Sequence, residues 1–119
     1  MMRLPQEIQV WYVLPALRRE LAILLAHSTP RKEIAKTLGV SEAAVSQYLS
    51  SKRGNNVAFD RQIMGQIAAA AARISRDSSQ AMAELIRLSE LPGVMQAMCR
   101  LHKEQEPSVE KGCDICFRR

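Results

Sequence analysis

The stretch RKEIAKTLGVSEAAVSQYL, residues 31–49, decides the fold of this chain. Apolar residues recur at helical spacing on both sides of Gly39, and glycine suits a tight turn because it tolerates a positive φ angle. Ala35 supplies the small side chain that two steeply crossing helices need where they touch. Ser41 is a typical N-cap for the helix that follows and runs to about Ser51. The stretch therefore predicts two short helices joined by a tight turn.

Outward from this stretch, the rest of the chain also predicts helices. Strand signals are weak, since the 119 residues include two Phe, two Tyr and one Trp and show no sustained alternation of period two. A first helix starts at Pro5 and kinks or restarts at Pro15, because proline has no backbone N–H to donate. Further helices are predicted over about 60–76, 79–91 and 94–103, before an irregular tail. We expect an all-α fold.

The charge of the chain is concentrated in its first half. The net charge is +5, and residues 1–59 carry eight Lys or Arg against four Asp or Glu. A polyanion would therefore meet this half. The longest apolar runs have six residues, Leu21–Ala26 and Ile67–Ala72, whereas a membrane-spanning helix needs about 20. We expect no membrane insertion and no export signal, and hence a cytoplasmic protein.

Four short segments carry a resemblance to a known family: Ile34–Ala35, Leu38–Ser41, Val45–Leu49 and Lys52–Gly54. Over residues 14–59 the chain resembles the lambda-repressor-like, XRE-type helix-turn-helix transcriptional regulators. It is similar in particular to small predicted archaeal and bacterial regulators with a cysteine-containing C-terminal segment. The resemblance implies a homodimer that binds double-stranded DNA.

In such a fold the second helix enters the major groove, so its outward residues read base edges. We expect base contacts from Ser41, Ala43, Ser46 and Gln47. Glutamine can bind adenine through two hydrogen bonds, and alanine can touch a thymine methyl group. Side chains that flank the two helices suit phosphate contacts, which position the protein without reading sequence. These are Thr29, Arg31, Lys32, Lys52 and Arg53.

The alanine-rich helix over about 60–76 is the expected dimerisation element. One helix in one groove gives modest specificity, and modules of this kind usually bind near-palindromic DNA as twofold dimers. Residues 63, 64, 67, 68, 71 and 74 form an apolar stripe on this helix, and alanine also fills positions 69, 70 and 72. The alternative is that the stripe packs against the first half of the same chain.

The C-terminal cysteines predict a metal centre. Cys99, His102, Cys113 and Cys116 form the pattern C-x2-H-x10-C-x2-C, a complete set of four ligands. We expect one centre per chain, with Zn²⁺ preferred to an iron–sulfur cluster because a closed tetrahedral set suits zinc. The centre is either structural or sensory. Thiols that bind no metal, and a thiol redox sensor, are the alternatives.

Other classes of function are less well supported. The four expected ligands leave no open metal position, and the sequence has no phosphate-binding glycine loop and no nucleophile elbow. We therefore expect no enzyme and no small-molecule substrate. A protein-interaction adaptor that uses the same module without DNA is the main alternative to the regulator.

Together these patterns divide the chain into three expected parts. Residues 1–56 form a helix-turn-helix DNA-binding domain. Residues 57–103 form a helical dimerisation or packing segment. Residues 99–119 form a short, irregular metal-binding tail that overlaps the end of the last helix.

Overall fold

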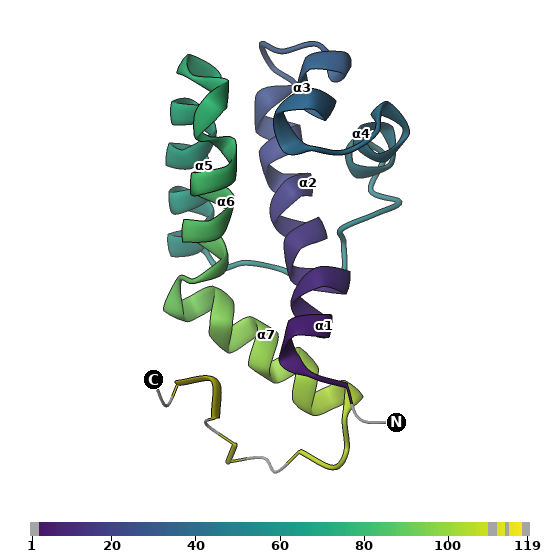
Figure 1. Cartoon of the computed structure of the whole chain (residues 1–119), viewed down its shortest axis with the longest axis vertical. Helices are drawn as coiled ribbons and strands as arrows, with labels where there is room; N and C mark the ends of the chain where they lie inside the picture. The colour runs from purple at the N-terminus through teal and green to yellow at the C-terminus, as the bar shows by residue number, and fades with distance from the viewer. Residues whose placement is uncertain (1–2, 110–111, 114, 118–119) are drawn as a thin grey trace.

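A computed structural model of the chain describes residues 3–109, 112–113 and 115–117 (Figure 1). Within these ranges the structure is all-helical and compact, as expected, and contains no β-strand. No helix in the described ranges is long and apolar enough to span a membrane. The elements are α1 Pro5–Ile8, the π-helical turn η1 Gln9–Val13, α2 Leu14–Leu25, α3 Arg31–Leu38, α4 Glu42–Leu49, α5 Arg61–Arg76, the 3₁₀ turn η2 Ser78–Gln80, α6 Ala81–Ser89, α7 Pro92–Gln105 and the 3₁₀ turn η3 Ile115–Phe117.

The first helical segment continues through Pro15 instead of restarting there. The turn before the proline widens into the π-helical η1, in which the N–H of Leu14 donates to the carbonyl of Gln9. This wider turn accommodates the proline ring, which would otherwise crowd the carbonyl four residues earlier. The irregularity expected at Pro15 therefore takes the form of the π-helical turn η1. Elements α1, η1 and α2 follow one another without a break.

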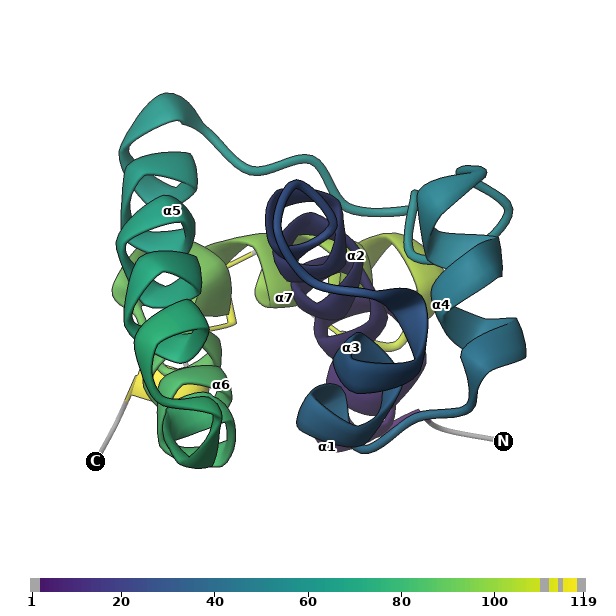
Figure 2. The same cartoon turned by 90° about the horizontal axis from the view of Figure 1, so that it is seen from above.

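Helix α2 occupies the middle of the molecule. Seen from above, it lies between the α5–α6 pair and α4 (Figure 2), and it contacts both α4 and α5. Leu17 and Leu21 on α2 are fully buried, as are Ile67 on α5 and Val45 on α4. One hydrophobic core therefore joins the two halves of the chain through α2.

Helix α3 ends and helix α4 begins as the sequence predicts. Gly39 has φ +70°, and the N–H of Val40 donates to the carbonyl of Ala35 over 3.0 Å. The hydroxyl of Ser41 accepts the N–H of Ala44 over 3.0 Å and caps α4. A left-handed residue after the last helical turn, followed by a side-chain cap, makes the chain reverse within a few residues.

The apolar stripe of α5 packs against other helices of the same chain. Asp60 caps its first turn by accepting the N–H of Ile63 over 2.8 Å. The stripe residues Ile63, Ile67 and Ile74 are buried, and α5 contacts α2 and α6 of the same chain. The packing alternative thus accounts for most of this stripe. The outer face of α5 leaves a second set of small residues exposed: Gly65, Ala68, Ala69 and Ala72.

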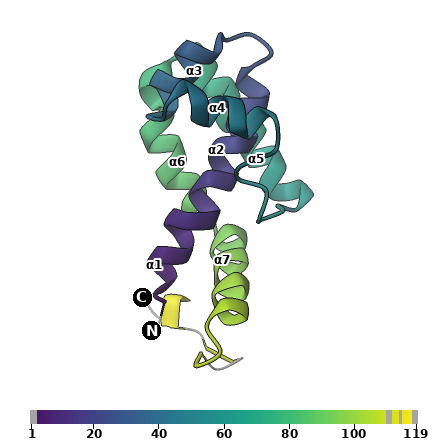
Figure 3. The ribbon, with the colours of Figure 1, turned by 90° about the vertical axis from the view of Figure 1, so that its right-hand side faces the viewer.

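Helix α7 lies beside α1 (Figure 3) and holds the N-terminal segment. The Nε2 atom of His102 is 2.6 Å from the carbonyl oxygen of Arg3. The N–H of Arg3 donates to Oε2 of Glu106 over 2.8 Å, and this bond lowers the pKa of Glu106. These contacts join residues about a hundred positions apart and hold the N-terminal segment against the C-terminal end of α7.

Candidate nucleic-acid interface

Helix α4 has one buried side and one outer side, and the predicted base-reading residues lie on the outer side. Ala44, Val45 and Tyr48 are buried in the core. Residues 41, 42, 43 and 47 are exposed, and residue 46 is half-buried. Positions 43 and 47 are one helical turn apart, so they share a face with residue 46 between them. The structure therefore gathers Ser41, Ala43, Ser46 and Gln47 on one surface.

The N-terminus of α3 brings a cation onto this surface. Arg31 and Lys32 are exposed in the first turn of α3, and Thr29 is half-buried just before it. Nη1 of Arg31 donates to the hydroxyl of Ser46 over 3.2 Å, across fifteen positions of sequence. The outer face of α4 therefore includes a guanidinium from α3, which spacing in the sequence did not reveal. A guanidinium group frequently donates hydrogen bonds to phosphate and to guanine.

The turn after α4 holds two more cations. Ser51 has φ +60°, and the N–H of Lys52 donates to the carbonyl of Gln47 over 2.9 Å, which closes the last turn of α4. Lys52 and Arg53 are exposed beyond it. The guanidinium of Arg53 lies 6.0 Å from the centroid of the Tyr48 ring, whose position is set by the core.

This turn is held in place by contacts that sequence reasoning missed. Gly54 is buried, and its Cα faces the carbonyl of Pro15 so closely that an added Cβ would be 2.5 Å from that oxygen. Nη2 of Arg19, on α2, donates to the hydroxyl of Ser51 over 3.0 Å. Both contacts tie the turn to α2. The only sequence signal for them was the glycine itself.

The cations around α4 have no carboxylate partner in the described part of the chain. Within the described part of the chain, Arg31, Lys32, Lys52 and Arg53 form no ion pair with a carboxylate. Carboxylates elsewhere in the fold do pair with arginines, as Glu20 does with Arg19 and Glu84 does with Arg73 and Arg87. Positive charge is thus left beside Ser46 and in the turn after α4, where an anionic partner would find it.

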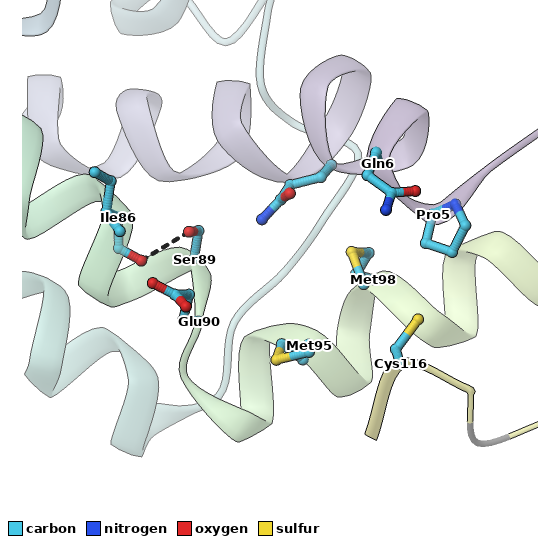
Figure 4. A pocket seen from close by; sticks show the side chains of 9 residues that line it. Pro5, Gln6, Ile86, Ser89, Glu90, Met95, Met98 and Cys116 are labelled. Atoms are coloured by element: carbon cyan, nitrogen blue, oxygen red, sulfur yellow. Dashed lines mark hydrogen bonds between the residues drawn. The ribbon is translucent and has the colours of Figure 1, made fainter. Parts of the chain in front are cut away.

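The three cysteines among the predicted metal ligands line two different cavities. Cys99 and Cys113 line one, and Sγ of Cys99 is 4.0 Å from the carbonyl oxygen of Cys113. Cys116 lines another, next to Met98 (Figure 4). His102 contacts Arg3 through Nε2. Among the described residues, no three His, Cys, Asp or Glu side chains are grouped so that they could hold a metal ion.

No known protein family, characterised protein or solved structure matches this chain in comparisons with each. The function of the chain is therefore inferred from its own residues and from their geometry.

Proposed function

We propose that the chain is a sequence-specific DNA-binding transcriptional regulator, in which α3 and α4 act as a helix-turn-helix. The observation that carries the proposal is the outer face of α4. It combines small and amide side chains with cations beside Ser46 and in the turn after α4, and these cations form no ion pair within the described part of the chain. A reading helix needs this combination, because base edges are read by short polar and apolar groups while phosphates on either side attract the cations.

The roles of the individual residues follow from their places on α4. The major groove of B-DNA is about 12 Å wide and admits a helix. The amide of Gln47 pairs with an adenine edge, and the methyl group of Ala43 packs on a thymine methyl. Ser41 and Ser46 donate to bases or phosphates, and Arg31 approaches beside Ser46. Lys32, Lys52 and Arg53, together with Thr29, bind the flanking phosphates.

The regulator acts as a homodimer in the cytoplasm and binds a near-palindromic site. A single α4 reads too few base pairs for a useful operator, so two copies are needed. The outer face of α5 supports this, because Gly65, Ala68, Ala69 and Ala72 are exposed there and allow two helices to approach closely. The buried stripe of α5 meanwhile holds the helix rigidly against α2.

Selection from a random double-stranded DNA library, followed by fluorescence anisotropy on the enriched sequence, tests the proposal. We expect Gln47→Ala to weaken binding by about 1–3 kcal/mol, or about 5- to 150-fold, for each half-site, and to relax the preference at one base pair in each half-site. Gln96→Ala, an exposed glutamine on α7, is the matched control and should leave binding unchanged.

The salt dependence gives an independent measurement. Four cations in each protomer of a dimer predict a slope of about −7 for log K against log salt, at about 0.9 per phosphate contact. Arg53→Ala should reduce this slope by about 2 per dimer, whereas Arg76→Ala on α5 should not change it. If the protein binds no DNA even at low salt, the regulator is excluded and the protein-interaction adaptor becomes the better explanation.

The metal centre is a separate proposal with its own test. To share one ion, the four side chains would have to come closer together, because no three such groups are gathered among the described residues. His102 would have to exchange its contact with Arg3 for the metal or use Nδ1. Elemental analysis and a visible spectrum of protein purified without oxygen decide between outcomes. One zinc per chain, or iron with sulfide, supports the Cys3His set if Cys99→Ser removes the metal. Protein without either metal refutes it and leaves the DNA proposal intact.

A further inference from the structure

Two adjoining cavities lie along α6, and we call the pair the furrow. The first encloses about 510 Å³ between α2, α3 and α6, and the second about 260 Å³ between α1, α6 and α7. They share the lining residues Gln9, Ile86 and Ser89, so the two cavities adjoin at these side chains. Figure 4 shows the second cavity, with Ile86 at one end and Met98 and Cys116 at the other. The hollow is therefore elongated.

The floor of the furrow is apolar and open to solvent. Leu14, Leu38 and Leu85 line the first cavity, together with Met82 and Ile86. Met82 is 75% exposed and Ile86 is 53% exposed, although both are large apolar side chains. Exposed apolar side chains gathered in a concave surface are typical of a binding site.

The charge in the first cavity has one sign. Arg18 and Lys36 line it, and no Asp or Glu does so among the described residues. Nε of Arg18 is buried and has no hydrogen-bond partner within the described part of the chain. A buried donor of this kind is costly until an acceptor reaches it, and a guanidinium pairs best with a carboxylate. Glu90, the acidic residue of the furrow, lies in the second cavity.

We propose that the furrow binds a small amphipathic carboxylate with an unbranched alkyl chain. The carboxylate pairs with Arg18 and Lys36, and the chain runs over Ile86 toward Met98. The first cavity alone falls within the range of about 300–1,000 Å³ that is usual for small-molecule sites. The flexible side chains of Met82, Met95 and Met98 can adapt to chains of different length. Polarity along the furrow sets the direction of the ligand, because Glu90 repels the carboxylate from the other end.

The site adjoins the end of α3, since residues 36–39 form part of its wall. If the chain is the regulator proposed above, such a ligand would be its effector. Binding is measured on the protein without DNA, so that failure of the site and failure of the regulator are told apart.

Titration of the full chain with sodium octanoate, observed by NMR of ¹³C-methyl methionine, tests the proposal. The Met82 signal should shift saturably, while the signal of Met64, on α5 outside the furrow, should stay in place. Octan-1-ol has a similar chain without the carboxylate and should bind about tenfold more weakly. Arg18→Met should reduce this difference between the two probes, with Lys36 retaining part of it, and Arg76→Met, an exposed arginine elsewhere, should preserve it.

Ile86→Gln separates the apolar part of the site from the charged part. Ile86 is half exposed, so the variant is expected to fold, and it should weaken octanoate and octan-1-ol alike. The proposal is overturned if Met82 does not respond to millimolar octanoate. It is also overturned if the acid and the alcohol bind equally well to the unaltered protein, or if Arg18→Met leaves their difference unchanged.

Discussion

Alanine substitution at Gly39 and at Gly54 is expected to have very different costs, although both glycines have a similar positive φ angle. Gly39 ends α3 with φ +70°, and Gly54 has φ +75° in the turn that holds Lys52 and Arg53. A Cβ added at Gly39 meets no atom within 4 Å. At Gly54 it lies 2.5 Å from the carbonyl oxygen of Pro15 and 2.9 Å from Cβ of Arg19.

The magnitudes follow from these distances. Gly39→Ala incurs the cost of an L-residue in the left-handed region, about 1–2 kcal/mol. Gly54→Ala incurs the same cost and adds overpacking of about 1–3 kcal/mol, so its total is about 2–5 kcal/mol. The neighbour at Gly54 is backbone, which cannot rotate away as a side chain would. The turn must therefore move away from α2.

Gly65→Ala provides a control of opposite sign. Gly65 lies within α5, is exposed, and an added Cβ meets no atom within 4 Å there. In the interior of a helix, alanine is more favourable than glycine by about 0.5–1 kcal/mol. At protein concentrations where the chain is monomeric and the outer face of α5 is uncovered, this variant should therefore stabilise the protein.

Urea unfolding followed by circular dichroism measures all three variants on one scale, since a chain of this size is expected to unfold in one cooperative step. The expected order of stability is Gly65→Ala, then the unaltered protein, then Gly39→Ala, then Gly54→Ala. Equal losses at Gly39 and Gly54 would refute the close approach of the turn to α2. Gly54→Ala should also weaken DNA binding more than Gly39→Ala does, because it displaces Lys52 and Arg53.

Three further variants test separate parts of the fold. Ser51→Gly removes the strain of the positive φ at Ser51 and should raise the free energy of unfolding by about 0.5–1 kcal/mol in urea titrations. The loss of the exposed hydrogen bond from Arg19 to the Ser51 hydroxyl reduces this gain. Glu84→Gln should lower it by about 1 kcal/mol at pH 7, because Arg73 and Arg87 are partly exposed and water screens both pairs. The hydrogen bond from Arg73 lowers the pKa of Glu84 in the folded state. The stabilisation by Glu84 is therefore complete above the unfolded-state pKa of about 4.3 and is lost as the pH falls through the lower pKa of the folded state. The free energies of unfolding of the two proteins should converge in acid, and a difference that stays constant with pH would contradict this. Ala69→Glu on the outer face of α5 should give monomers by analytical ultracentrifugation with little change in thermal stability, and dimers that persist would place the interface elsewhere.

The sequence by itself determined the local structure. The two helices around Gly39, the cap at Ser41 and the long helix after residue 60 could all be predicted, because caps, turns and helical periodicity depend on neighbours within a few positions. The outward residues of α4 could be predicted for the same reason, since the period of the helix decides which positions are buried together. The widened turn before Pro15 was beyond this reasoning, because a proline permits several local solutions.

Only the tertiary structure decided which surfaces meet. It placed the apolar stripe of α5 against α2, set Arg31 beside Ser46, and joined His102 to Arg3 across nearly the whole chain. It also placed Cys116 and Cys99 in the walls of different cavities, although their spacing in the sequence suits one metal site. The packing of the helices leaves the furrow along α6. Contacts between distant segments depend on how all the helices fill space together, and no local pattern of residues records that.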